Sequence, residues 1–359
     1  ISSTSHLVTT TAGTSNLVLG ENAGNSIASG GNYNVCIGDE AGTDLTTGDM
    51  NTLIGFSAGD NLDTPASNTV VGAYALTADT KGAKSVAIGT GALETQNFTS
   101  DTEAYNVAIG FQAGNDITTG LQNTLIGGRA GDSLTDADFN VAVGEVALAT
   151  DTQGSRSVAI GRAALNAQNF TSATDAYNTA VGNNAGLSIT TGIRNILIGG
   201  LAGDALTDAD FNIGIGHQAL TNDTQGSKAT AVGYRTLANQ NFSSATDSHN
   251  TAIGNDAGLN ITTGQQNVLI GSLAGDALTD ADINVAIGYD ALGSDTLGNR
   301  SVAIGYEALQ TQNFTSATST YNTAVGGQAG KSITTGQNNT LIGGLAGDAL
   351  TDADHNIAI

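Results

Sequence analysis

The sequence predicts an all-β fold: a parallel β-solenoid of about twenty 17- or 21-residue coils, grouped in 72-residue repeats. A five-residue string that ends in glycine, Asn-Val-Ala-Ile-Gly at 106–110, recurs along the chain. Its glycines stand at 38, 55, 72, 89 and 110, so that three short steps precede one longer step, and this series continues to the end. Such a fixed period is typical of stacked repeats. The 49 glycines and 4% aromatic residues would fill a globular core poorly, whereas flat coils need no large side chains.

The five-residue string predicts one short strand in each coil. Ile or Val precedes nearly every glycine, and Val, Thr, Ile or Leu stands two positions earlier, a β-branched pattern that favours a strand. These two residues share one face and the residue between them lies on the other. We expect the pair to face the coil interior and the middle residue to face away from it. The glycine permits a sharp corner with positive φ.

A polar residue opens the string, and it is asparagine in sixteen of the twenty copies. Stacked amides can hydrogen-bond along a stack, and asparagine can also stabilise a turn with its side chain. We therefore predict an asparagine ladder at one corner of the coils. Its members include Asn106, Asn123, Asn140, Asn178, Asn195, Asn212, Asn250, Asn267, Asn284, Asn322 and Asn339.

The fourth coil of each repeat is the longer one, and it carries Gln-Asn-Phe followed by Thr or Ser. The extra residues predict outward loops near 97–105, 169–177, 241–249 and 313–321, with the phenylalanine anchoring each loop. Ala113 and its equivalents, at the third position after the glycine, are expected to pack inside the coil.

The middle residue of the string is usually alanine, with leucine once in each repeat. If these residues face outward, they form a continuous apolar stripe that soluble monomers seldom tolerate. We therefore expect the stripe to be buried in a homotrimer, with contacts at Leu125, Leu197, Leu269 and Leu341.

Composition excludes several classes of protein. With 33 acidic and 10 basic residues, the formal charge of −23 disfavours partners such as nucleic acid or anionic membranes. No apolar run is long enough for a membrane-spanning helix, so we expect no membrane insertion. We expect residues 1–359 to form a single continuous solenoid domain, with 1–15 as a lead-in, and to be a fragment of a longer chain because both ends interrupt the pattern.

Clusters of aspartates suggest one possible ligand. Asp204, Asp208 and Asp210, with their equivalents in other repeats, could supply oxygen ligands to Ca²⁺. Their spacing matches neither an EF-hand nor a calcium-binding β-roll, so the stronger interpretation is a solvated turn without a cofactor. The basic residues Lys84 and Arg156, with their equivalents, are expected to form charge pairs with a neighbouring coil.

The strings Ser-Val-Ala-Ile-Gly at 157–161 and Asn-Val-Ala-Ile-Gly at 106–110 resemble the head repeats of YadA-type trimeric autotransporter adhesins. Asn-Thr-Ala-Val-Gly with a following Ala-Gly at 178–186, together with Ile-Thr-Thr-Gly, is similar to repeats of long phage tail fibres. The resemblance covers about residues 16–359. It implies a parallel β-roll, left-handed in the adhesin heads, assembled as a homotrimer.

These observations predict a structural protein and not an enzyme, because no nucleophile, base and orienting acid recur together. We expect an extracellular phage tail fibre shaft, on the virion, that spaces a host-recognition tip. The tip, or other flanking regions, would bind a host receptor or glycan. The alternative is a trimeric adhesin or filament on a bacterial surface that binds host matrix or neighbouring cells.

Overall fold

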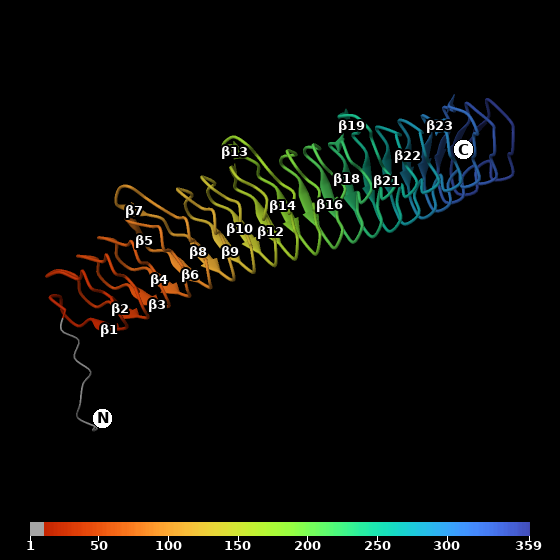
Figure 1. Cartoon of the computed structure of the whole chain (residues 1–359). Coiled ribbons are helices and arrows are strands. Elements are labelled where there is room, and N and C mark those ends of the chain that lie inside the picture. Colours follow the sequence, from red (N-terminus) through yellow and green to blue (C-terminus); the bar gives the residue numbers. More distant parts are fainter. Residues whose placement is uncertain (1–10) are drawn as a thin grey trace, which may run out of the picture. The chain divides into compact units, whose positions relative to one another are not determined.

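The computed structural model describes residues 11–359, and within this range it contains strands and turns but no helix. The chain winds through stacked coils whose strands pair in parallel, so the predicted β-solenoid is confirmed (Figure 1). Two compact units, ending at Tyr177 and beginning at Asn178, are described separately. The single continuous domain and the left-handed sense stay predictions, and residues 1–10 of the expected lead-in lie outside the described residues.

In the first unit, each coil contributes one three-residue strand that pairs residue for residue with the strand of the next coil. Thr124, for example, pairs with Val107 on one side and Val141 on the other. These strands are β1 (Leu17–Leu19), β2 (Val35–Ile37), β3 (Thr52–Ile54), β4 (Thr69–Val71), β6 (Val86–Ile88), β8 (Val107–Ile109), β9 (Thr124–Ile126), β10 (Val141–Val143) and β12 (Val158–Ile160).

The second unit repeats this arrangement, with Ile213 pairing with Ile196 and Thr230. Its strands are β14 (Thr179–Val181), β15 (Ile196–Ile198), β16 (Ile213–Ile215), β18 (Thr230–Val232), β20 (Thr251–Ile253), β21 (Val268–Ile270), β22 (Val285–Ile287), β24 (Val302–Ile304), β26 (Thr323–Val325), β27 (Thr340–Ile342) and β28 (Ile357–Ala358).

Each long coil adds a two-residue strand that pairs in parallel with the coil before it. The pairs are β5 (Gly82–Ala83) with β7 (Thr102–Glu103), β11 (Gly154–Ser155) with β13 (Thr174–Asp175), β17 (Gly226–Ser227) with β19 (Thr246–Asp247), and β23 (Gly298–Asn299) with β25 (Thr318–Ser319). Figure 1 shows β7, β13 and β19 on the protruding arcs of their coils.

The loop prediction is confirmed at the loop tips and corrected at their ends. Residues 99–101 and their equivalents are exposed, as expected for outward loops. Phe98 and Ala104, which lie on either side of this tip, are buried in the coil. The extra residues of the long coil therefore form an anchored bulge with a short strand, and the phenylalanine is the predicted anchor.

The glycine at the end of each strand turns the corner because no other residue fits there. Gly110 has a φ of 142°, and a Cβ atom added to it would lie 2.4 Å from the carbonyl oxygen of Gly127 in the next coil. Within each unit, glycine recurs at this position from coil to coil, so the corners stack directly on one another.

The middle residue of each strand points into the coil, which is the reverse of the prediction. Leu125, Leu197, Leu269 and Leu341 are fully buried within a single chain, as are the alanines at the same position. These leucines therefore have no exposed surface for a partner chain, and their assignment to a trimer contact is wrong. The physical reason is the thin interior, which is filled mostly by alanine and leucine, with Val70 as a β-branched exception, whereas the bulky first and third strand residues stand on the outside.

Candidate functional site

The predicted asparagine ladder is present and is fully buried. The side-chain Oδ1 of Asn106 accepts a hydrogen bond from the backbone N–H of Asn123 at 2.9 Å, and Asn123 repeats the contact with Asn140. The Nδ2 of Asn106 donates to the carbonyl oxygen of Gly120 at 2.7 Å. In the second unit, the backbone N–H of Asn195 donates in the same way to the Oδ1 of Asn178. Each side chain thus ties its coil to the next and closes its own turn.

The ladder changes at every fourth coil, where serine or alanine replaces asparagine and a different buried network takes over. The carboxylate of Asp79 accepts hydrogen bonds from the backbone N–H of Gly82 at 2.9 Å and from the Nε2 of Gln96 at 2.6 Å. Gln96 also donates to Ser85 at 3.2 Å and accepts from Asn106 at 2.8 Å. Burial raises the pKa of the Asp79 carboxyl, and the hydrogen bonds oppose that rise.

We call this network the clasp, defined by Asp79, Gln96 and their equivalents. It ties the long coil to the coil before it, because Asp79 also accepts a hydrogen bond from the backbone N–H of Phe98 at 3.2 Å. The equivalent pairs are Asp151 with Gln168, Asp223 with Gln240, and Asp295 with Gln312. Sequence reasoning missed these carboxylates. The available signal was that an Asp-Thr-x-Gly string always stands one short coil before Gln-Asn-Phe.

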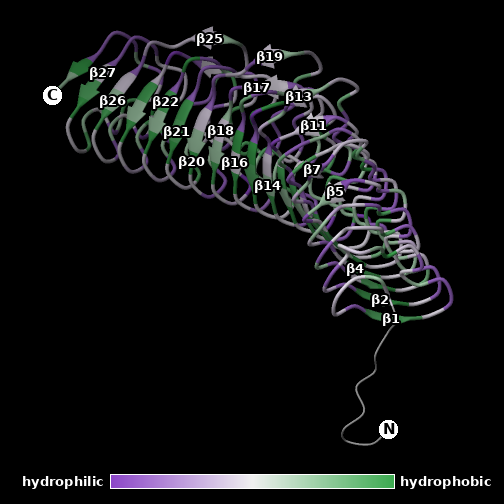
Figure 2. Ribbon diagram, turned by 90° about the vertical axis from the view of Figure 1, so that its left-hand side faces the viewer, coloured by the Kyte–Doolittle hydropathy of each residue, from purple (hydrophilic) through white to green (hydrophobic). Residues whose placement is uncertain are grey.

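The outer face of the strands, formed by the first and third strand residues, is apolar and accessible. Ile109 is 36% exposed and Ile253 is 40% exposed, although both lie in the middle of the paired strands of their units. None of these outward positions carries a charged residue, although the chain has 33 acidic and 10 basic residues. Figure 2 shows hydrophobic colour along the strands, for example β20 to β22, whereas many connecting turns are hydrophilic. We call this surface the strand face.

One edge of the strand face carries a column of aromatic and basic side chains, directly before the ladder position. The Arg156 guanidinium lies 4.8 Å from the centroid of the Phe139 ring and 2.9 Å from Asp175. Lys84 pairs with Glu103 at 2.5 Å, and Lys228 pairs with Asp247. These contacts confirm the predicted charge pair between neighbouring coils at three of its four positions. At the fourth, Arg300 lies 6.0 Å from the centroid of the Tyr321 ring, and Ser319 occupies the position of Asp175. The three ion pairs are solvent-exposed, so their role is to order the edge more than to stabilise the fold.

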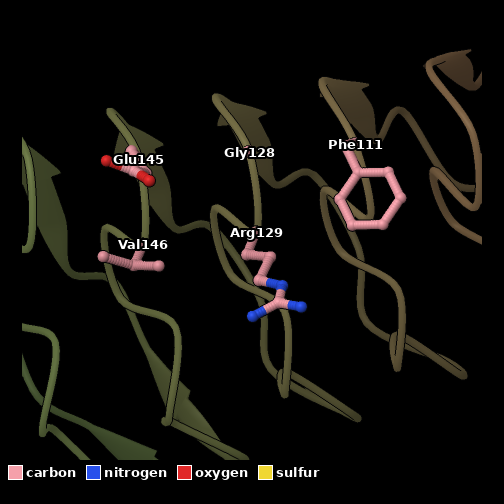
Figure 3. Close-up of a pocket in the computed structure, with 5 residues that line it drawn as sticks. All are labelled: Phe111, Gly128, Arg129, Glu145 and Val146. Carbon is pink, nitrogen blue, oxygen red and sulfur yellow. The ribbon is translucent and has the colours of Figure 1, made fainter.

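The opposite edge holds a shallow hollow of about 200 Å³ in the first unit (Figure 3). It lies between the side chains of Phe111, Arg129, Glu145 and Val146, above Gly128. The absence of a side chain at Gly128 creates the space, because an added Cβ atom there would meet nothing within 4 Å. The hollow is smaller than typical ligand pockets of roughly 300–1,000 Å³.

The aspartates considered as calcium ligands accept hydrogen bonds from groups of neighbouring coils. Asp208 accepts a hydrogen bond from the Thr191 hydroxyl at 2.7 Å, and Asp210 accepts one from the backbone N–H of Ile193 at 2.8 Å. Asp204 bonds instead to Thr221, on the other neighbouring coil. Within residues 11–359, no group of three or more acidic, histidine or cysteine side chains is placed to hold a metal ion.

At one position of the repeat, several aspartates have a raised pKa. Burial, reinforced by the nearby charges of Asp290 and Asp256, raises the pKa of Asp276 to about 6. The equivalent Asp204 has Asn184 and Gln218 where Asp276 has these two acidic neighbours. Asp60 and Asp132, at the same position in two other repeats, also have a pKa raised by burial and by nearby carboxylates. The repulsion from Asp290 and Asp256 together distinguishes the repeat of Asp276.

No protein-family model matches this sequence, and no curated protein matches it significantly. Across the described part of the chain, there is no helix long and apolar enough to cross a membrane.

Proposed function

We propose that this chain is a shaft segment of an extracellular phage tail fibre, assembled as a homotrimer through its strand face. The observation that supports the proposal is the uncharged strand face, which a single chain leaves exposed in both units. An apolar surface that continues over many coils is typical of a protein–protein interface. The resemblance to adhesin heads and tail fibres implies that the number of copies is three.

The chemistry of the face is suited to packing flat surfaces against each other. Its side chains are almost all Val, Ile and Thr, which have few rotamers and therefore lose little conformational entropy when a partner covers them. The ladder and the clasp fix the backbone beneath the face through buried hydrogen bonds. A rigid, repeated interface of this kind lets the fibre extend by adding coils, without a special structure at any one place.

The experiment is a measurement of molar mass by light scattering on the chain and on a variant with Ile109, Ile126 and Ile160 changed to lysine. We expect the native chain to have three times the monomer mass of 35.7 kDa. The variant should be a folded monomer, because the lysines would place like charges opposite each other in a desolvated interface.

A matched control changes the exposed loop-tip residues Thr171, Ser172 and Ala173 to lysine, which adds the same charge away from the strand face. This control should keep the native mass. A native chain that is monomeric, or an isoleucine variant that remains a trimer, would refute the proposed interface.

The bacterial adhesin remains the competing hypothesis, and the regions that flank this segment distinguish the two. An intramolecular chaperone or a receptor-binding tip would support the tail fibre. A coiled-coil stalk joined to a membrane anchor would instead identify an adhesin.

A further inference from the structure

The first unit contains one place where the repeat pattern is broken and a larger hollow opens. Its volume is about 350 Å³, and it is lined by Pro65, Ala66, Lys81, Ala83 and Asp101, with Thr64, Thr102 and Glu103. Pro65 is the single proline of the chain. This volume falls in the range of ligand pockets, roughly 300–1,000 Å³.

The next repeat shows why the hollow is specific to this place. There Asp138 and Ser155 occupy the positions of Ala66 and Ala83, and the Ser155 hydroxyl accepts a hydrogen bond from the backbone N–H of Asp138 at 2.9 Å. The Asp138 carboxylate in turn accepts from the backbone N–H of Leu121 at 2.7 Å. These polar side chains bridge the coils, whereas two alanines cannot. The change from Asp and Ser to two alanines therefore opens the surface and gives it a small apolar floor.

Positively and negatively charged groups surround this floor. The Nζ atom of Lys81 lies 3.6 Å from the Asp63 carboxylate, 3.8 Å from Asp101 and 3.4 Å from the Thr64 hydroxyl. Glu103 adds a further carboxylate, paired with Lys84 at the rim. With three carboxylates and two ammonium groups, the site repels phosphate and other anions, and the lysines disfavour a metal ion.

We propose that this hollow binds a single pyranose unit of a neutral saccharide. A sugar hydroxyl both donates and accepts, so it can accept from Lys81 while donating to Asp101 or Glu103. The C–H face of the ring fits the floor formed by Pro65, Ala66 and Ala83. Because the hollow is open and contacts one face of the sugar, we expect a dissociation constant on the order of 1–10 mM. The proposal does not depend on the trimer.

The test is saturation-transfer difference NMR on the whole chain with glucose, galactose, mannose and N-acetylglucosamine as separate probes at millimolar concentration. At least one sugar should receive saturation from the protein. Glutamate, a charged probe of similar size whose net charge is negative, should receive none.

The chain itself supplies matched variants, because the same fold already accommodates both sequences. A closing variant copies the next repeat into the first and should lose the sugar signal. Its changes are Thr64→Asp, Pro65→Ala, Ala66→Asp, Lys81→Gln, Ala83→Ser and Asp101→Ala. An opening variant makes the reverse changes and should strengthen the signal by creating a second site. Its changes are Asp136→Thr, Ala137→Pro, Asp138→Ala, Gln153→Lys, Ser155→Ala and Ala173→Asp.

Circular dichroism checks that each variant keeps its β structure. A signal that disappears on closing and grows on opening supports the site. No transfer to any of the four sugars, an undiminished signal in the closing variant, or transfer only to glutamate would overturn the proposal.

Discussion

At the scale of single residues, the core is a pattern of leucine fitted against glycine. Leu125 lies between Gly114 and Gly131, where an added Cβ atom would approach its methyl groups to 2.7 Å at either position. In the next coil the strand residue is Ala142, and the position of Gly131 is taken by the buried Leu148. A leucine thus fills the interior from the strand in one coil and from the turn in the next, which keeps the volume of the filling side chains nearly constant.

This packing predicts non-additive effects of substitutions. Leu125→Ala should lower the free energy of unfolding by about 2–5 kcal/mol through the cavity it leaves, and Gly131→Ala by about 1–3 kcal/mol through overpacking. The double variant should lose less than the sum, because removal of the leucine makes room for the new methyl group. Denaturant unfolding of the four proteins measures this coupling.

Gly128→Ala is the matched control, since its added Cβ would meet nothing within 4 Å. Its free energy of unfolding should stay within about 0.5 kcal/mol of the native value. Strict additivity of the Leu125 and Gly131 substitutions would contradict the packing described above.

Asp276 predicts a dependence of stability on pH. Its folded-state pKa of about 6 lies above the value of 3.8 for a free side chain, so the folded state binds the proton more tightly. The stabilisation from this proton is complete at low pH and is lost as the pH rises through about 6. Thermal unfolding of Asp276→Asn should therefore show a higher midpoint than the native chain at pH 7 and a smaller change between pH 7 and pH 5.

The control for this prediction is Asp204→Asn, at the same position in a repeat where Asn184 and Gln218 replace the acidic neighbours. It should leave the pH dependence as in the native chain. Equal pH profiles for the native chain and the Asp276 variant would show that the repulsion has no effect on folding.

At the scale of elements, the long coil depends on the clasp and on its phenylalanine. Phe170 is buried, and its backbone N–H donates to Asp151 at 3.0 Å. Phe170→Ala should release the bulge at 171–175 and cost about 3 kcal/mol, because a large buried side chain is lost. Hydrogen exchange should then accelerate at 171–176, while Thr171→Ala, at the exposed tip, should leave it unchanged. Acceleration spread evenly over all coils would argue against a local anchor.

The positions of the strands, corner glycines and asparagine ladder follow from spacing alone, because each recurs with the same period. The spacing does not show whether a given strand residue points into the coil or out of it. Alternation shows that Val107 and Ile109 share a face but not which face is inside, and the deciding fact is the width of the interior. In the sequence, the width of the interior is indicated only by the large Leu125 standing with Gly131, which has no side chain. The clasp between Asp79 and Gln96 likewise becomes apparent only when the coils are placed in register.

At the scale of the whole molecule, the four-coil repeat is the unit whose removal leaves each remaining coil with equivalent neighbours. Deletion of residues 195–266 joins Arg194 to Asn267 and restores the ladder position, the strand and the clasp order in the second unit. Because stacked repeats interact mainly with their neighbours, we expect the shortened chain to fold with a similar thermal midpoint.

Deletion of residues 195–264 is the contrasting variant, since it leaves two extra residues and shifts the strand out of register with the coil before it. This variant should lose cooperative unfolding, as followed by circular dichroism. If both deletion variants unfold in the same way, the four-coil repeat is not the structural unit of the stack.

The serine that interrupts the ladder has a mechanical consequence. In three of the four interruptions a serine stands at this position, and Gln96, for example, donates to Ser85 across it. At the fourth interruption the residue is Ala229. The Gln240 amide there donates to Asp223 and accepts from Asn250, but Ala229 offers no hydroxyl for a further hydrogen bond. Under tension along the stack, the junction after Ala229 should therefore part first. The absence of one hydroxyl oxygen would then decide at which pair of coils a stretched solenoid begins to unfold.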